Sequence, residues 1–229
     1  RLAHYQHDQY FYDLCDKYGL IVWQDFMVAC ANIWLTEDME KEFTAEIIYN
    51  VKRIRHHACL GILCGNNEME EAICNWDCAD GNDPLVRKDY LKLYEDIFPK
   101  LCTQLAPYIS YTPSSPTSGG NFQDPQSFNE GDVHFWNVWN GNCGFDEYRK
   151  YKFRFCAEYG FESLPSFKTI MEFCPQGELN PLSYTMESHQ KHWNGNVKLI
   201  RYLAEQYLLP KNLEATAYAS QINQANAIK

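Results

Sequence analysis

The sequence predicts an α/β fold in which helices cover a parallel sheet. Short apolar segments alternate with amphipathic helical segments at least four times along the chain. Polar side chains directly follow several of the apolar segments, as happens where parallel strands end at the functional edge of a barrel. These observations favour a TIM barrel, with a doubly wound sheet as the alternative. The chain has no GxGxxG, Walker A or GxSxG motif that would indicate a nucleotide fold or a serine hydrolase.

The N-terminal part of the chain contains a helix, a strand and a second helix. A helical pattern covers about 8–18 and ends at Gly19, and the apolar run Leu20 to Trp23 then predicts a buried strand. Thr36 is suited to cap the following helix. The apolar face of that helix is formed by Phe43, Ile47, Val51 and Ile54.

The middle of the chain repeats this order of elements. The run Leu60 to Cys64 predicts a second strand, and a helix over about 86–105 is expected to bend at Pro99. A third strand is predicted from Tyr108 to Tyr111. The loop that follows, over 113–131, is long and rich in Ser, Pro and Gly, which is typical of functional or mobile loops.

The C-terminal part supplies two more strands and then helices. Alternating residues from Val133 to Trp139 predict a strand with two distinct faces. A short helix is expected over about 145–152, and a strand from Phe153 to Ala157. From Ser166 onward the pattern is mainly helical.

Composition limits the partners of this protein. The 229 residues suffice for one large domain or two small ones, and no internal repeat or clear linker divides them. A net charge of -10 argues against nucleic acid, and no basic amphipathic or membrane-spanning segment indicates a membrane partner. The ten cysteines lie mostly in apolar runs without metal-site spacing, so we expect free buried thiols and favour a reducing, cytoplasmic compartment. No signal peptide opens the chain.

Two glutamates stand out because each follows a short apolar run beside small or polar residues. Glu68 ends the segment GNNE over 65–68, and Glu158 lies within FCAEYGF over 155–161. Two carboxylates that face one pocket from different strands are the minimum equipment for cleaving a glycosidic bond. The alternative is that both are carboxylates that cap helices.

Five sequence blocks in fixed order carry a resemblance to a known family. They are 16–26 (DKYGLIVWQDF), 64–68 (CGNNE), 113–116 (PSSP), 131–139 (GDVHFWNVW) and 155–161 (FCAEYGF). Together they resemble glycoside hydrolase family 2, specifically its β-mannosidase branch, over nearly the whole chain. The resemblance implies a (β/α)8 barrel in which Glu68 ends strand four as acid/base and Glu158 ends strand seven as nucleophile. The strands from Leu20, Tyr108 and Val133 then become strands three, five and six.

The resemblance also implies that residues 1–229 are one catalytic TIM-barrel domain that is incomplete at both ends. It lacks the first two strands, the eighth strand, and the β-sandwich domains that accompany the barrel in this family. The implied substrate is a β-linked mannoside or oligosaccharide, and no cofactor or metal is expected. Related β-glucosaminidase or β-galactosidase activity is the nearest alternative. A catalytically incompetent carbohydrate-binding fragment is the alternative from another class.

Further site residues follow from the resemblance and from their position. Asn67 is expected to bind the substrate 2-hydroxyl, and candidate cleft residues are Trp76, His134, Trp136 and Trp139. On a continuous strand Trp136 and Trp139 point to opposite faces, so at most one would line the pocket. His134 is equally compatible with a core histidine. Glu70 and Glu71 are expected on a solvated face. Glu68 is expected to have a raised pKa because of the charge on Glu158.

Overall fold

The structure, a computed structural model, describes all 229 residues, and they form two compact units. Unit 1 comprises residues 1–134 and 152–157, and unit 2 comprises residues 135–151 and 158–229. Each unit has its own buried hydrophobic cluster. The units are described separately below.

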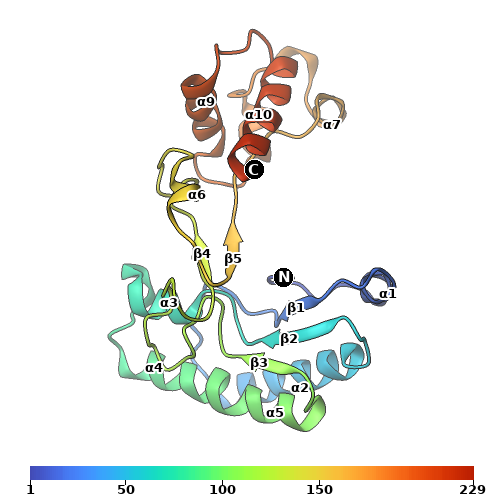
Figure 1. The fold of residues 1–229 in the computed structure, drawn as a ribbon, viewed down its shortest axis with the longest axis vertical. Helices are drawn as coiled ribbons and strands as arrows, with labels where there is room; N and C mark the ends of the chain where they lie inside the picture. The colour runs from blue at the N-terminus through green and yellow to red at the C-terminus, as the bar shows by residue number, and fades with distance from the viewer. The chain divides into compact units, whose positions relative to one another are not determined.

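Unit 1 is built on a parallel sheet of three strands in the order β1-β2-β3 (Figure 1). The strands are β1 (Val22–Asp25), β2 (Leu60–Cys64) and β3 (Ser110–Thr112), and they pair in parallel throughout. All three were predicted, although β1 begins later than expected. Ile21 is 85% exposed, so the apolar run enters the buried sheet only at Val22.

Helices α2 and α5 cover one face of this sheet and pack on each other (Figure 1). The helical segments of unit 1 are α1 (Gln9–Tyr18), α2 (Glu37–Ile54), α3 (Met69–Asn75), η1 (Asp77–Ala79), α4 (Pro84–Tyr90), η2 (Leu91–Ile97) and α5 (Phe98–Leu105). Ile47, Val51 and Ile54 on α2 are at most 1% exposed, as the predicted apolar face requires. Burial of each such side chain stabilises the folded state by about 1.5–3 kcal/mol.

Local sequence signals explain where these helices begin and end. Gly19 ends α1 in the left-handed region at φ +67°, a conformation that glycine adopts without steric cost. The Thr36 hydroxyl accepts a hydrogen bond from the Met39 amide at 3.2 Å, which confirms the predicted cap of α2. Near Pro99, where a bend was predicted, a π-helical segment, η2, ends two residues before the proline. Its wider turn tolerates a residue that lacks an amide donor.

Strands β4 (Val133–Phe135) and β5 (Cys156–Tyr159) pair as a two-stranded sheet, and the chain passes between the units within them. The prediction of a strand from Val133 to Trp139 was too long. The extended backbone ends at Phe135 and a turn follows over 137–140, so the alternating pattern continues beyond the strand that it predicted.

Unit 2 is mainly helical, as predicted from Ser166 onward. Its segments are α6 (Glu147–Lys150), α7 (Phe167–Phe173), η3 (Gln176–Glu178), α8 (Tyr184–His189), α9 (Gly195–Gln206) and α10 (Leu213–Ile228). Helix α10 packs against α7 and α9. The core includes Ile170 and Tyr202, and the Tyr202 hydroxyl donates to the Val138 carbonyl at 2.6 Å. This bond ties α9 to the turn after β4.

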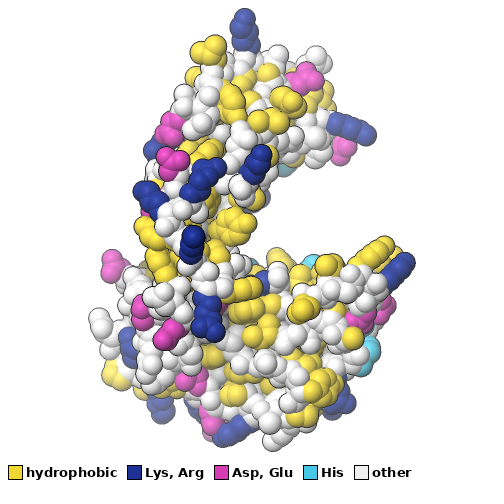
Figure 2. Space-filling view, in the orientation of Figure 1, with side chains coloured by type: hydrophobic (Ala, Val, Ile, Leu, Met, Phe, Trp, Pro, Cys, Tyr) yellow, Lys and Arg dark blue, Asp and Glu magenta, His cyan; other side chains and the backbone are white.

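Both units expose large apolar side chains, and acidic and basic side chains are interspersed with them on the face shown in Figure 2. Ile21 of unit 1 is 85% exposed, and Leu208 of unit 2 is 95% exposed. None of the helices combines the length and the apolar character needed to cross a membrane.

All ten cysteines are free, as the sequence predicts. Five of them are buried, namely Cys15, Cys59, Cys64, Cys102 and Cys174. Cys30 and Cys78 are exposed, so the expectation of buried thiols holds for only part of the set.

Candidate active site

The carboxyl end of the unit 1 sheet positions the residues of the CGNNE block. Single parallel bridges join Ala29 to Asn67 and Asn67 to Ser115, which continues the strand order beyond β1, β2 and β3. The Asn67 amide donates to the Val28 carbonyl at 2.9 Å, and the Glu68 amide donates to the Ser115 carbonyl at 2.8 Å. Asn67 and Glu68 are therefore fixed by backbone hydrogen bonds on both sides.

Glu68 stands between this edge and α3 in a strained backbone conformation. Its φ of +61° and ψ of 6° lie in the left-handed region, which non-glycine residues seldom adopt. Such strain is typical of functional positions whose surroundings enforce it. The side chain makes no capping bond to α3, so the alternative that Glu68 caps a helix is wrong.

Two side chains donate hydrogen bonds to the Glu68 carboxylate. Oε1 lies 2.8 Å from His134 Nδ1, and Oε2 accepts from Cys30 Sγ at 3.3 Å. His134 is 5% exposed and Glu68 is partly buried. His134 was predicted either to bind substrate or to lie in the core, and the structure places it against Glu68.

Arg1 is the centre of a buried polar network at the same edge. Its Nη2 lies 2.6 Å from Asp25 Oδ2 and donates to Asn67 Oδ1 at 2.7 Å, while Nη1 lies 2.8 Å from His134 Nε2. A guanidinium only donates hydrogen bonds, so Nε2 is the acceptor and the His134 proton sits on Nδ1, directed at Glu68. Arg1 thereby orients both Asn67 and the donor to Glu68.

Ser115 and Asp132 continue this network from the same ring nitrogen of His134. Ser115 Oγ donates to Asp132 Oδ2 at 2.5 Å and lies 2.9 Å from His134 Nε2. Asp132 Oδ1 accepts from the Thr117 amide at 3.0 Å. Ser115 is fully buried and Asp132 is 3% exposed, so these bonds form where water competes little.

The network lowers the pKa of Glu68. Burial acts to raise this pKa, but the hydrogen bonds from His134 and Cys30 and the positive charge of Arg1 together outweigh it. This result is the opposite of the raised pKa that we expected for the acid/base. By contrast, burial raises the pKa of Asp25 and of Asp132 despite their hydrogen bonds.

Glu158 lies within β5 and belongs to unit 2, so it does not cap a helix. Trp136, directly after β4, donates its indole N–H to Glu158 Oε2 at 3.2 Å. Both side chains are half-buried. The structure thus pairs the predicted nucleophile with one of the predicted aromatic cleft residues in the same unit.

Trp139 is a core residue of unit 2 and not a cleft wall. It is 6% exposed and packs edge-to-face on Phe161 with 5.0 Å between ring centroids. The Lys198 ammonium lies 5.6 Å from its ring centroid. Because the chain turns after Phe135, the side chain of Trp139 enters the core and leaves too little surface for a sugar ring.

Trp76, at the end of α3, is partly exposed and hydrogen-bonds Glu71. Glu71 is partly buried, and burial raises its pKa while bonds from Gln126 and Trp76 oppose that rise. Glu70 is fully buried and accepts from Thr117 Oγ1 at 2.6 Å and from the Phe122 amide at 2.7 Å. The expectation of a solvated face at Glu70 and Glu71 was wrong because these residues anchor the long loop.

The residues missed by sequence reasoning are those that support Glu68. They are Arg1, Asp25, Cys30, Ser115 and Asp132. All but Arg1 and Cys30 lie inside the sequence blocks quoted above, but residue type alone does not reveal a contact between residues far apart in sequence. Arg1 is the first residue of the sequence, and nothing in its local sequence indicates its pairing with Asp25.

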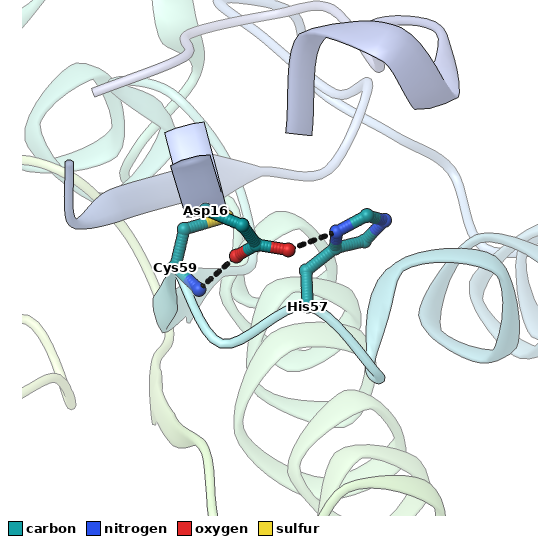
Figure 3. A group of neighbouring side chains, drawn as sticks. All are labelled: Asp16, His57 and Cys59. Atoms are coloured by element: carbon teal, nitrogen blue, oxygen red, sulfur yellow. Dashed lines mark hydrogen bonds and ion pairs between the residues drawn. The ribbon is translucent and has the colours of Figure 1, made fainter. Parts of the chain in front are cut away.

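A second cluster in unit 1 has the residue types of a metal site but forms a structural clasp. Ligand atoms of Asp16, His57 and Cys59 lie within 4.8 Å of one another (Figure 3). Asp16 accepts from the Cys59 amide at 2.6 Å and lies 2.7 Å from His57 Nδ1, so both its oxygens are engaged. Burial, and after it the hydrogen bond and charge of Asp16, raise the pKa of the Cys59 thiol to about 12. The clasp joins the end of α1 to the turn before β2.

Known proteins that are similar to this chain include β-mannosidases. No protein-family model matches the chain. Among curated proteins it is similar to β-mannosidase B of Aspergillus niger (32% identical over 236 residues) and of Thermothelomyces thermophilus (33% identical over 235 residues). Each alignment covers 96% of this chain and 27% of the relative. The crystal structure of β-D-mannosidase from Dictyoglomus thermophilum matches with a TM-score of 0.86 and 33% identity, over 97% of this chain and 27% of that one.

The chain is therefore a homologue of glycoside hydrolases. In particular, it is homologous to a segment of β-mannosidases, and it spans 27% of the length of the relatives quoted. Its mixed α/β structure with parallel strands is similar to the corresponding part of a solved β-mannosidase.

Proposed function

We propose that this chain is part of the catalytic domain of a retaining exo-β-glycosidase, a β-mannosidase that releases terminal β-D-mannose. The observation that carries the proposal is the position of Glu68. It follows β2 at the carboxyl edge of a parallel sheet and is held by His134 and Cys30. This arrangement lies in a segment homologous to β-mannosidases.

The proposal assigns β1 to β5 to strands three to seven of a (β/α)8 barrel of glycoside hydrolase family 2. In support, β1, β2 and β3 are parallel neighbours in chain order, with α2 and the α4–α5 segment between them. Residues 1–229 would form one incomplete barrel domain. The missing strands and the β-sandwich domains of a longer protein would account for the apolar side chains that each unit exposes.

In the proposed reaction Glu158 is the nucleophile and Glu68 the acid/base. The Glu158 carboxylate attacks the anomeric carbon, and the bond to the leaving oxygen breaks as Glu68 gives that oxygen its proton. Glu68, now ionised, takes a proton from water, and the resulting hydroxide displaces Glu158 from the sugar. The two displacements retain the configuration of mannose at the anomeric carbon.

The polar network gives Asn67 a defined orientation for this chemistry. Arg1 donates to the side-chain oxygen of Asn67. The side-chain nitrogen of Asn67 therefore points toward Cys30 and is the group proposed to donate to the substrate 2-hydroxyl. A hydrogen bond to this hydroxyl strengthens as charge develops at the anomeric carbon. Trp136 and Trp76 are the proposed aromatic walls, and the mechanism requires no cofactor or metal.

The network also disfavours the protonated form of Glu68 that the acid step requires. Because the pKa of Glu68 is lowered, its protonated form is the minority form at neutral pH in the absence of substrate. The proposal therefore includes an acidic pH optimum for kcat/KM. The free cysteines support a reducing compartment as the place of action.

Substitution of Glu68 in the full-length protein tests the assignment. Glu68→Gln should reduce turnover of β-mannobiose far more than turnover of a nitrophenyl β-mannoside, because nitrophenolate leaves with little proton assistance. Equal losses on both substrates would contradict an acid role. Rates on nitrophenyl β-mannoside, β-glucosaminide and β-galactoside distinguish β-mannosidase from its related activities.

A second candidate function is that of a carbohydrate-binding piece without turnover. Two observations favour this candidate for the 229 residues expressed alone. Large apolar side chains are exposed, and the chain spans only 27% of the length of its relative from Aspergillus niger. This piece should be inactive and prone to associate through unpaired strand edges. Turnover of nitrophenyl β-mannoside by the purified piece would exclude this candidate.

A further inference from the structure

We infer that a pocket at the far end of α3 binds a distal sugar unit of a β-linked mannooligosaccharide, an inference that rests on the proposed function. The pocket has a volume of about 390 Å³, within the range of about 300–1,000 Å³ that is usual for small-molecule sites. It lies in unit 1, where the end of α3, the loop after it and the start of α4 supply the lining residues. Its lining includes Asn75, Trp76, Asp77, Asn82 and Arg87.

The pocket is a preformed feature of the chain because its loop is fixed. A Cβ on Gly81 would come within 1.8 Å of the Ile73 carbonyl oxygen, so the loop packs directly on the backbone of α3. Arg87 Nε donates to the Gly81 carbonyl at 2.6 Å, and its guanidinium lies 4.5 Å from the Phe122 ring centroid. Asp83 caps α4 by accepting from the Leu85 amide at 2.8 Å. A ligand would therefore bind without ordering the loop.

The lining has the chemistry of a sugar site. Trp76 offers a partly exposed aromatic ring, and the apolar face of a pyranose stacks on such rings. Asn75, Asp77 and Asn82 are exposed, and their side chains make no hydrogen bond within the protein. Amide and carboxylate groups of this kind can accept and donate to the hydroxyl groups of a neutral sugar. The excess of carboxylates disfavours an anionic ligand.

The position of the pocket indicates which sugar it takes. Glu68 and Trp76 are the residues at the two ends of α3, eight positions apart, so they are separated by about 12 Å along the helix axis. Glu68 protonates the leaving oxygen in the proposed reaction. A single ring cannot bridge this separation, whereas a short β-linked chain on the leaving-group side can. The pocket then selects for substrate length.

Binding to the full-length protein carrying Glu158→Gln tests the inference without turnover. Calorimetry compares β-mannobiose with β-mannotetraose for this protein and for versions that add Asn82→Ala or Asp77→Ala. Each added substitution should weaken mannotetraose binding about tenfold, as expected for one or two lost hydrogen bonds. Mannobiose binding should change by less than about twofold. The matched control is Asn129→Ala, another exposed asparagine of unit 1, which should alter neither.

Each other result overturns the inference. Unchanged mannotetraose binding in both pocket variants would remove the pocket from the substrate path. Equal weakening for mannobiose would place these side chains beside the cleaved bond. The sugar pocket is rejected if neither sugar binds. It is also rejected if the pocket variants lose only the binding of added calcium, because the pocket would then be a cation site. Hydrolysis of nitrophenyl β-mannoside by the protein with Glu158 intact then decides separately whether the proposed function stands.

Discussion

Units 1 and 2 hold their candidate catalytic carboxylates in different ways. In unit 1, Glu68 belongs to a buried network of charges and polar groups that runs through His134, Arg1 and Asp25. In unit 2, Glu158 lies on a strand and accepts a hydrogen bond from the Trp136 indole, and the buried cluster of that unit consists of apolar and aromatic side chains. Polar substitutions in the unit 1 network should therefore change stability and ionisation together, whereas unit 2 should stay folded when its carboxylate is removed.

The largest effect is expected from Glu158→Ala in the full-length protein. Loss of the nucleophile should reduce kcat/KM for nitrophenyl β-mannoside by more than about 10³-fold. The midpoint of thermal unfolding should change little, because the side chain is half-buried and lies outside the apolar core. Glu172→Ala, on the exposed face of α7, is the control and should retain full activity. Full activity of Glu158→Ala would refute its assignment as nucleophile.

Asp25→Ala should destabilise the protein more than any surface charge change. It removes the carboxylate that pairs with the Arg1 guanidinium, whose side chain is 5% exposed, and breaking such a buried pair costs about 3–5 kcal/mol. Denaturant unfolding measures the change. Asp38→Ala removes a carboxylate that is 93% exposed in a pair with Lys41, and its unfolding midpoint should equal that of the unchanged protein. Equal midpoints for both variants would contradict the buried network.

Glu70→Ala should have an intermediate effect that is confined to the long loop. It leaves the Thr117 hydroxyl and the Phe122 amide without an acceptor, at a cost of about 1–3 kcal/mol for each group that stays buried. Amide hydrogen exchange over 117–124 should accelerate, while exchange in α2 should not. Glu70→Gln keeps an acceptor oxygen and should show a smaller change. Identical exchange in Glu70→Ala and the unchanged protein would show that Glu70 does not anchor the loop.

The smallest effect is a shift in pH dependence for His134→Phe. Removing the Nδ1 donor weakens the stabilisation of ionised Glu68, so its pKa should rise from the present lowered position. The proton of Glu68 would then persist to higher pH, and the alkaline limb of kcat/KM should move upward. A limb that stays in place or moves down would contradict the contact. His189→Ala, in unit 2, is the control and should leave the profile unchanged.

Stability provides a second measurement of the same contact. Ionised Glu68 stabilises the folded state above its unfolded pKa, and this contribution is lost as pH falls through the folded pKa. In His134→Phe the loss on acidification should be smaller than in the unchanged protein. An equal loss would mean that His134 does not lower the pKa of Glu68.

Patterns in the sequence predicted the three parallel strands of unit 1, the helices α1 and α2, and the order of these elements, but not α3. Periodicity identified β2 and the buried face of α2, and Gly19 and Thr36 marked helix ends, because these signals depend on neighbours in the chain. It also identified Glu68 and Glu158 as candidates and Asn67 as a neighbour of the site. Their chemical roles remain proposals.

The groups that surround those carboxylates became apparent only from the tertiary structure. The pairing of Arg1 with Asp25 and His134, the burial of Glu70 and the core position of Trp139 all join residues that are distant in sequence or depend on where a strand ends. The direction of the Glu68 pKa shift reverses our expectation for the same reason. Ionisation depends on the sum of burial, charge and hydrogen bonds in space, and a linear sequence does not contain that sum.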